Sequence, residues 1–445
     1  MKWESGSLQG RIDWVLIGSV AGLLIIGTIA ILSAASPLPF YSMIIKKHFI
    51  ALGVGILLFL LAFGFNYQVF QDQSKTVYAL TILMMIAVLV VGDLHRGQRA
   101  WIRFSFFSFQ PSELARVATV LILAGFLDRR GGKPKSLGHI MGAFGVAAPI
   151  MGLILAEPDF SSTLSFFPFL LGMLYCSGAS MAPLLAMAGF GAITLSLPLM
   201  WTLLSLRPDW TQSWMLLGVF MKIRAFDVPL AATVVGIFVM VFLMWKMTVW
   251  LRFNAPPPYF VVLAFILSLG LCSGVVLDHQ LKGYQRDRFV AFLVPDKDPR
   301  GSAYNVAQAQ IAIGSGGLWG KGIFAGTQSQ LGFVPERHTD FIFAVIGEEM
   351  GFIGALSVLL LYMTMLWRIV QTAMLSRDRF GYLVCCGMAA TYGFYLMVNV
   401  GMCLGFVPVA GIQLPLLSYG GSNLVATLLA LGIVANIYSK RHAFY

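Results

Sequence analysis

The chain has 445 residues, of which 58% are hydrophobic and 11% are charged, and its formal net charge is +11. Soluble domains carry about 25% charged residues, and the mean hydropathy here is +0.82, so an ordinary soluble protein is excluded. The basic residues are scattered among loops instead of covering one soluble face, so no nucleic acid is expected as a partner. We predict an all-α fold: a polytopic membrane helix bundle forming one integral membrane domain, residues 1–445.

Apolar runs of roughly 20 residues recur along the chain and predict about twelve transmembrane helices. The expected spans lie near 14–33, 49–66, 78–92, 112–127, 138–156, 161–177, 181–203, 228–247, 258–277, 341–367, 381–404 and 416–438. Residues 204–226 hold an apolar run too short to span, and Trp210 and Trp214 favour an interfacial helix there. The first run lacks a cleavage site, so no signal peptide is expected.

Lys and Arg in short loops predict the orientation, because they favour the cytoplasmic side. Basic residues gather at 129–135, 246–252, 368–379 and 440–441, and all four places fall on one side of the predicted bundle. Both termini are therefore expected to be cytoplasmic. The loops near 93–111 and 278–340 are then extracytoplasmic.

The large extracytoplasmic loop, 278–340, is dense in charges, glycines and prolines, and non-helical backbone of this kind cannot lie unpartnered in lipid. Loops are the usual place for chemistry in such a chain. Asp296 and Asp298 lie in an Asp-Pro turn among basic residues that include Arg286 and Arg300. A solvated turn is the plain interpretation. A carboxylate among cations also suits an enzyme that deprotonates a hydroxyl beside an anionic leaving group.

The short outer loop near 93–111 carries Arg96, Arg99 and Arg103, against the usual charge rule for that side. An anionic substrate on the outer face would account for these arginines. His338, further along the chain, is by itself a weak base or ligand candidate. No His/Cys cluster indicates a metal site.

The glycine-rich run 314–322 fails the nucleotide P-loop pattern, since Ser315 and Gly322 stand at positions that need Gly and Ser or Thr. We expect a tight turn against helices instead. Glu113 and Arg116 are spaced i,i+3 and can pair on one helix face. Such groups, like Glu348 further along the chain, are costly inside a membrane and serve either structure or function.

These motifs together resemble the SEDS family, the RodA/FtsW/SpoVE group of cell-wall polymerases, and most of all its elongation members. The matching pieces are 110–116, 157–159, 284–286, 298–299, 314–322, 336–349 and 414–422, in the family's order. Arg337 stands where division members usually have Ala. Typical members have ten spans, so the resemblance implies an inserted pair of crossings, formed by roughly residues 204–257 with the neighbouring span.

The resemblance implies a peptidoglycan glycosyltransferase that polymerises lipid II for cell elongation and rod shape. The reaction would invert the configuration at the anomeric carbon of the sugar. Undecaprenyl diphosphate would be released, with Asp298 as the catalytic base. No cofactor is certain, and a divalent cation is left open. The candidate substrate-binding residues are Trp101, Arg96, Arg99, Arg103, Glu113, Arg116, Arg286, Arg300, Lys321, His338, Glu348 and Ser418.

Two rival functions remain open at this point. A lipid II flippase would line a path with Glu113, Arg116, Glu348 and Glu349, and a noncatalytic scaffold would only hold a transpeptidase. The expected partners are lipid II, membrane lipid and a class B penicillin-binding protein, in a bacterial cytoplasmic (inner) membrane. The partner's helix is expected on small residues of the span near 381–404: Gly387, Ala389, Ala390, Gly393 and Gly401.

Overall fold

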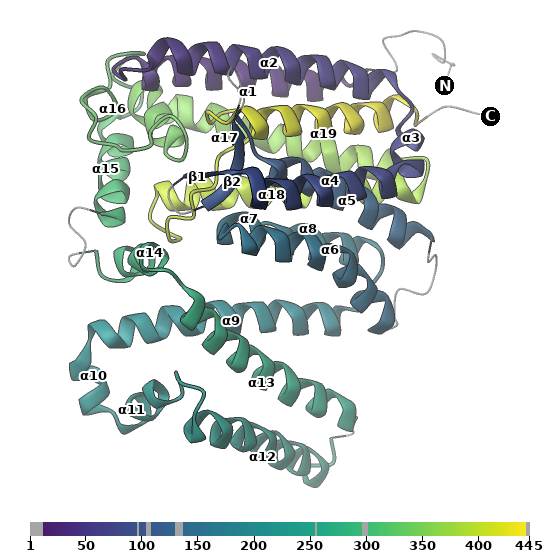
Figure 1. Cartoon of the computed structure of the whole chain (residues 1–445), viewed down its shortest axis with the longest axis vertical. Helices are drawn as coiled ribbons and strands as arrows, with labels where there is room; N and C mark the ends of the chain where they lie inside the picture. The colour runs from purple at the N-terminus through teal and green to yellow at the C-terminus, as the bar shows by residue number, and fades with distance from the viewer. Residues whose placement is uncertain are drawn as a thin grey trace. The chain divides into compact units, whose positions relative to one another are not determined.

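The computed structural model describes residues 12–95, 98–103, 108–129, 137–253, 256–295 and 301–441. The described residues are almost entirely helical (Figure 1). The elements are α1 (Trp14–Ala35), α2 (Tyr41–Gly64), α3 (Tyr67–Asp72), α4 (Ser74–Val91), β1 (Asp93–His95), β2 (Gln98–Arg103), β3 (Ser108–Phe109), α5 (Pro111–Arg129), α6 (Leu137–Ala156), α7 (Phe160–Leu164), α8 (Phe166–Cys176), α9 (Met181–Leu206), α10 (Pro208–Ser213), α11 (Met215–Lys222), α12 (Val228–Trp250), α13 (Pro257–Gln280), α14 (Gly283–Leu293), α15 (Ser302–Ser315), α16 (Thr327–Gln330), α17 (Ile342–Leu375), α18 (Arg379–Cys403) and α19 (Gly421–Ser439).

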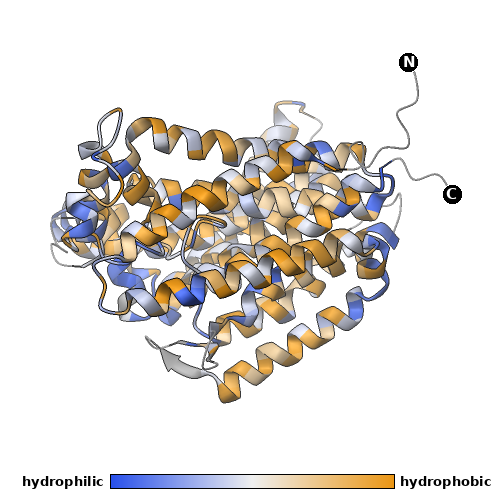
Figure 2. Cartoon of the chain, turned by 90° about the horizontal axis from the view of Figure 1, so that it is seen from above, coloured by the Kyte–Doolittle hydropathy of each residue, from blue (hydrophilic) through white to orange (hydrophobic). Residues whose placement is uncertain are grey.

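The prediction of a polytopic helical bundle is confirmed. Among the described residues, ten helices are long and apolar enough to cross a membrane. The two other predicted spans are also helical: α5 carries charged residues at both ends and is mostly buried, and α7 with α8 forms a shorter apolar pair. Figure 2 shows apolar residues along the helices and hydrophilic ones gathered at many of their ends.

The chain divides into two compact units, Met1–Ala179 with Asn305–Tyr445, and Ser180–Tyr304. The expectation of a single membrane domain with an insertion at 204–257 stays a prediction, and the 204–257 segment lies within the second unit.

Helix α19 is the core of the first unit, and it packs along α2 and against α5, α17 and α18. Most of its residues are buried, so it is shielded by protein on nearly every side. At Gly432 the backbone of α2 comes so close that an added Cβ would lie 2.6 Å from the carbonyl oxygen of Phe59. Small residues permit this kind of close approach between membrane helices.

The predicted loop near 93–111 contains a small antiparallel sheet in the order β1-β2-β3. Trp101 is paired with Asp93 across the first two strands, and Ile102 with Phe109 across the next two. Strand β2 packs on α4 and α5, and β3 on α19. The sheet therefore leads directly into the N-terminus of α5.

Helix α17 is broken at Gly351, whose φ of 67° and ψ of −165° are non-helical. The glycine-rich turn satisfies the backbone groups that the break exposes. Lys321 and Gly322 donate to the carbonyls of Glu348 and Glu349, and the N–H groups of Phe352 and Ile353 donate back to Gly317 and Leu318. Irregular backbone at membrane depth is tolerated only when it is partnered in this way. The predicted tight turn against a helix is confirmed.

The second unit is built on α9 and α13, which pack along each other, with α12 against α13. Its core contains Trp201, Ile223, Leu230, Leu271 and Val275. The short helices α10 and α11 follow α9, and the side chains of Trp210 and Trp214 are exposed. The predicted interfacial helix falls here; this part is helical, and its position at a membrane interface stays a prediction.

Candidate active site

A buried ion pair lies at the start of α5. Pro111 takes the first helical position, where a missing N–H costs nothing, and Glu113 lies in the first turn, where the helix dipole favours an acid. Arg116 Nη2 lies 3.1 Å from Glu113 Oε2, and both residues are buried. Asn423 Nδ2 of α19 donates to the same oxygen at 3.1 Å. The predicted pairing of Glu113 with Arg116 is confirmed.

The Arg116 guanidinium also lies over the ring of Tyr395 on α18, 4.7 Å from its centroid. Its Nε is buried and has no hydrogen-bond partner in the part of the chain that the structure describes. A small cavity beside the pair, with room for roughly one water molecule, is lined by both charged side chains and by Tyr392 and Thr427. The Arg116 cation is thus held between the Glu113 carboxylate and the face of the Tyr395 ring.

Three motifs that are far apart in the sequence meet beside this pair. The backbone N–H of Gln110 donates to Ser422 Oγ at 2.8 Å, and Gln110 Nε2 donates to Asp159 Oδ2 at 3.2 Å. Asp159 also caps α7, because its Oδ1 accepts from the N–H of Ser162. The 110–116, 157–159 and 414–422 motifs therefore form one buried polar cluster in the first unit.

Glu157 adds an unusual carboxyl group in the turn between α6 and α7. It is fully buried, and neither carboxyl oxygen has a hydrogen-bond partner among the described residues. Burial, together with the neighbouring Asp159 carboxylate, raises the pKa of Glu157 to about 8. The side chain is therefore largely protonated at neutral pH.

A second carboxylate pair, Glu348 and Glu349 on α17, holds the loop before α17. Glu348 accepts from the backbone N–H groups of Gln328 and Ser329 and pairs with Lys321 Nζ at 2.9 Å. Glu349 accepts from Ser33 Oγ at 2.6 Å. Glu348 is fully buried and well supplied with donors, so in this structure it anchors the loop. Its contact with substrate stays a prediction.

His338 contacts Tyr419, the residue that follows Ser418 in the chain. The carbonyl oxygen of His338 accepts from the N–H of Tyr419 at 2.8 Å, and the two rings lie 5.6 Å apart. Ser418 is buried, and its Oγ accepts from the N–H of Leu414 at 2.9 Å. Ser418 thus closes the turn that precedes α19.

The sheet carries two further predicted residues. Arg99 on β2 is exposed, and Trp101 on the same strand is half-buried. Arg103 ends β2, and its side chain lies outside the described part. Arg96, Asp298 and Arg300 lie outside the described residues altogether, so their predicted roles remain predictions.

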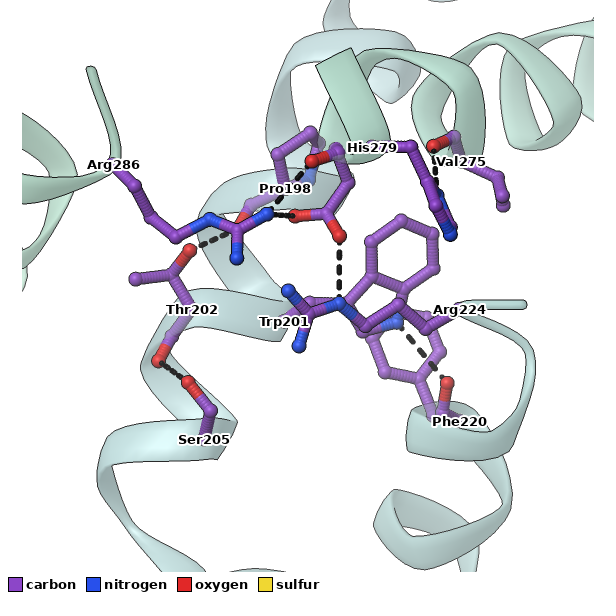
Figure 3. Close-up of polar contacts among 10 residues, drawn as sticks. Pro198, Trp201, Thr202, Ser205, Phe220, Arg224, Val275, His279 and Arg286 are labelled. Carbon is purple, nitrogen blue, oxygen red and sulfur yellow. Dashed lines mark hydrogen bonds and ion pairs between the residues drawn. The ribbon is translucent and has the colours of Figure 1, made fainter. Parts of the chain in front are cut away.

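Arg286 belongs to the second unit, where Figure 3 shows it beside the ends of α9 and α13. Its Nη2 donates to the backbone carbonyl of Asp278 at 2.7 Å and lies 3.3 Å from the Asp278 carboxylate. Arg224 shares that carboxylate, with Nε 2.6 Å from Oδ2. Arg286 is one of the predicted substrate-binding residues, whereas Asp278 and Arg224 are not.

Several members of the polar clusters were not predicted as site residues. Gln110, Asp159 and Ser422 were visible in the motifs, but nothing in the sequence indicated that the motifs would meet. Tyr395 gave no signal beyond being an aromatic residue in an apolar span. In the described ranges, no group of three His, Cys, Asp or Glu residues is placed to hold a metal ion.

Comparisons with known proteins agree with this arrangement. The family model FtsW/RodA/SpoVE, described as cell cycle protein, matches residues 12–215 and 211–443. The chain belongs to this family. It is 31% identical to the peptidoglycan glycosyltransferase MrdB of Escherichia coli (strain K12), covering 84% of this chain and 80% of that protein. It is 30% identical to the peptidoglycan glycosyltransferase RodA of Treponema pallidum, covering 96% and 98%.

Solved structures have the same fold. A chain from a study of the coordination of polymerization and crosslinking by a peptidoglycan synthase complex matches with a TM-score of 0.62 and 27% identity. That match covers 99% of both chains. A variant of the rod shape determining protein RodA from Thermus thermophilus matches with a TM-score of 0.58 and 25% identity, covering 99% of this chain and 100% of that one. This chain is therefore a multi-pass membrane protein of the RodA type.

Proposed function

We propose that this protein is a peptidoglycan glycosyltransferase that polymerises lipid II into glycan strands during cell elongation. One observation carries the proposal: three family motifs converge on the buried cluster of Gln110, Asp159 and Ser422. They do so in a chain that is about 30% identical to named peptidoglycan glycosyltransferases over most of its length. The relatives' activity and the arrangement of the family motifs thus support the same function.

The proposed reaction needs one base. A hydroxyl of one lipid II sugar attacks the anomeric carbon of another, a new C–O bond forms, and the bond to the undecaprenyl diphosphate oxygen breaks. Asp298 takes the hydroxyl proton, and the diphosphate leaves with the bonding electron pair. A diphosphate already leaves well, so a second carboxylate acting as an acid is not required, in contrast to a glycosidase.

Cations on the outer segments are proposed to stabilise the developing charge on the diphosphate. Arg99 is exposed on β2, which suits contact with a large anionic substrate, and Trp101 lies two residues further along the same strand. Arg96, Arg103, Arg286 and Arg300 are proposed for the same role. A divalent cation bound to the diphosphate oxygens stays a proposal, which assays with and without a chelator will test.

The rival flippase function would need the buried charges to line one path. Glu113 pairs with Arg116 and accepts from Asn423, whereas Glu348 pairs with Lys321 and Glu349 accepts from Ser33. Among the described residues, no hydrogen bond or ion pair joins the two sets. Two separate clusters, each paired within itself, support a structural role for these charges over a continuous polar path.

We also propose a class B penicillin-binding protein as partner, because a polymerase that makes uncrosslinked strands needs a transpeptidase. A solved structure similar to this chain comes from a complex that couples polymerization and crosslinking.

The predicted docking residues on α18 differ in how much open space surrounds them. An added Cβ at Gly387 would clash with Met173 and Val120, and Ala390 packs near Gly172, whereas Gly393 has open space around it. The proposed contact is therefore centred on Gly393.

Purified protein supplied with lipid II in detergent tests the activity, with glycan chains resolved on a gel. The proposal expects long strands, and a flippase or scaffold would make none. Co-purification of the transpeptidase tests the partner: Gly393→Leu should reduce it. Gly53→Leu on α2, which also has open space around it, should not.

We place the protein in the bacterial cytoplasmic (inner) membrane with both termini in the cytoplasm.

A further inference from the structure

A cluster of charged residues lies at the end of α13. Asp278 stands in the last turn of that helix and is almost fully buried. An acid is unfavourable there, because the C-terminal end of a helix already carries partial negative charge. Two arginines compensate for it: Arg224, which follows α11, and Arg286 on α14. Figure 3 shows the two arginines converging from separate segments.

The cluster holds more positive charge than its own carboxylate neutralises. Two guanidinium groups share the single carboxylate of Asp278, so the group of three has a net charge of +1. The side chains of Arg224 and Arg286 are 29% and 37% exposed, so a ligand can reach them. His279 lies next in the sequence, but its Nδ1 is bonded to the carbonyl of Val275, and its ring lies near Phe226.

Donors are also left over. A guanidinium has five N–H groups, and among the described residues the hydrogen bonds of this cluster use only Nε of Arg224 and Nη2 of Arg286. Nε of Arg286 is buried without a partner in the described part of the chain. The nearby hydroxyls of Thr202 and Ser205 donate to the backbone carbonyls of Pro198 and Thr202 on α9. The unused donors therefore belong to planar, cationic guanidinium groups that are fixed in place. Such groups suit the binding of a phosphate group.

The depth of the cluster indicates where that phosphate comes from. Helices α9 and α13 are both of membrane-spanning length, and the cluster lies where each of them ends. The segment between Leu206 and Val228 exposes large apolar side chains, including Trp210, Trp214 and Phe226. Aromatic residues of this kind mark the headgroup level of a bilayer. Guanidinium groups at this level can form charge-assisted hydrogen bonds with lipid phosphate groups.

We propose that Arg224 and Arg286, held by Asp278, form a binding site for the phosphate group of a membrane lipid. Asp278 orients both guanidiniums and removes half of their charge, so that one phosphate completes the charge balance. The lipid is either an anionic phospholipid of the bilayer or the diphosphate-bearing substrate. Only the second source rests on the proposed function.

Native mass spectrometry of the full-length purified protein tests the site with phosphatidylglycerol and, for comparison, phosphatidylcholine. Arg224→Ala should weaken retention of phosphatidylglycerol about fivefold and leave phosphatidylcholine unchanged. Lys222→Ala is the matched control, because it removes the same charge from an exposed side chain two residues away. It should leave retention of both lipids unchanged. Arg224→Gln can still donate to Asp278 and should show the same loss if the alanine variant folds poorly.

The KM for lipid II in the polymerisation assay separates the two sources. A rise of about fivefold in Arg224→Ala, with kcat unchanged, identifies the substrate diphosphate. A loss of phosphatidylglycerol retention with KM unchanged identifies a bilayer phospholipid. Equal retention and equal KM in wild type, Arg224→Gln and Lys222→Ala would overturn the proposal. An inactive wild-type protein would refute the proposed function while the mass-spectrometry result still decides the phosphate site.

Discussion

The carboxylate of Glu113 and the guanidinium of Arg116 lie 3.1 Å apart in the first two turns of α5, and both are almost closed to solvent. Removing one member of a buried pair strands the other charge, at a cost of about 3–5 kcal/mol. Glu113→Ala should therefore lower the melting temperature sharply. The double Glu113→Ala, Arg116→Ala variant should recover part of the loss. Strictly additive losses would show that the two side chains do not stabilise each other.

Stability should depend on the ionisation of Glu157. Its pKa is about 8 in the folded protein, against an ordinary value of 4.5, so folding favours the protonated form. The contribution of this group is most favourable below about pH 4.5 and is lost as pH rises to about 8, by about 1.4 kcal/mol per pH unit. Glu157→Gln should thus be more stable than wild type at pH 9, and the difference should shrink towards pH 5. Parallel melting curves across this range would contradict the assignment.

The glycine-rich turn should not accept a side chain where it meets the break in α17. Gly320 has a φ of 82°, and an added Cβ would lie 2.1 Å from the carbonyl oxygen of Glu349. Gly320→Ala should destabilise the protein by about 2 kcal/mol or more in thermal or denaturant unfolding. Gly314→Ala is the matched control, since that position lies in α15 with open space around it. It should be neutral or slightly stabilising.

Labelling of single cysteines tests the predicted orientation. In a variant without the native cysteines, Ser302→Cys should react with a membrane-impermeant reagent in intact spheroplasts. Lys440→Cys, near the C-terminus, should react only after the membrane is broken. The reverse pattern would invert the topology and place the 278–340 loop in the cytoplasm.

Local patterns in the sequence predicted the features that depend on residues close together in the chain. Apolar runs located the helices, the i,i+3 spacing predicted the Glu113–Arg116 pair, and the glycines at 314–322 predicted a tight turn. Contacts between distant segments had no such signal. Ser33 and Glu349 are 316 residues apart, and Arg224 and Asp278 are 54 apart. Only the packing of the helices brings these partners together, because no helical or strand periodicity links them.

The short β1-β2-β3 sheet was not predicted, for a similar reason. Its strands, β1 to β3, are two to six residues long, and their pairing depends on packing against α4, α5 and α19. The family motifs pointed to the correct residues of the buried cluster, but the hydrogen bonds of Gln110 to Ser422 and Asp159 could only come from the fold.

Polymerisation of lipid II by the Asp298→Asn variant tests the central claim most directly. The purified variant should melt close to the wild-type temperature and bind lipid II, yet make no glycan strands, because the attacking hydroxyl has lost its base. Asp296→Asn, two residues away in the same turn, is the matched control and should keep most of the activity. Strands made by Asp298→Asn at the wild-type rate would contradict the account.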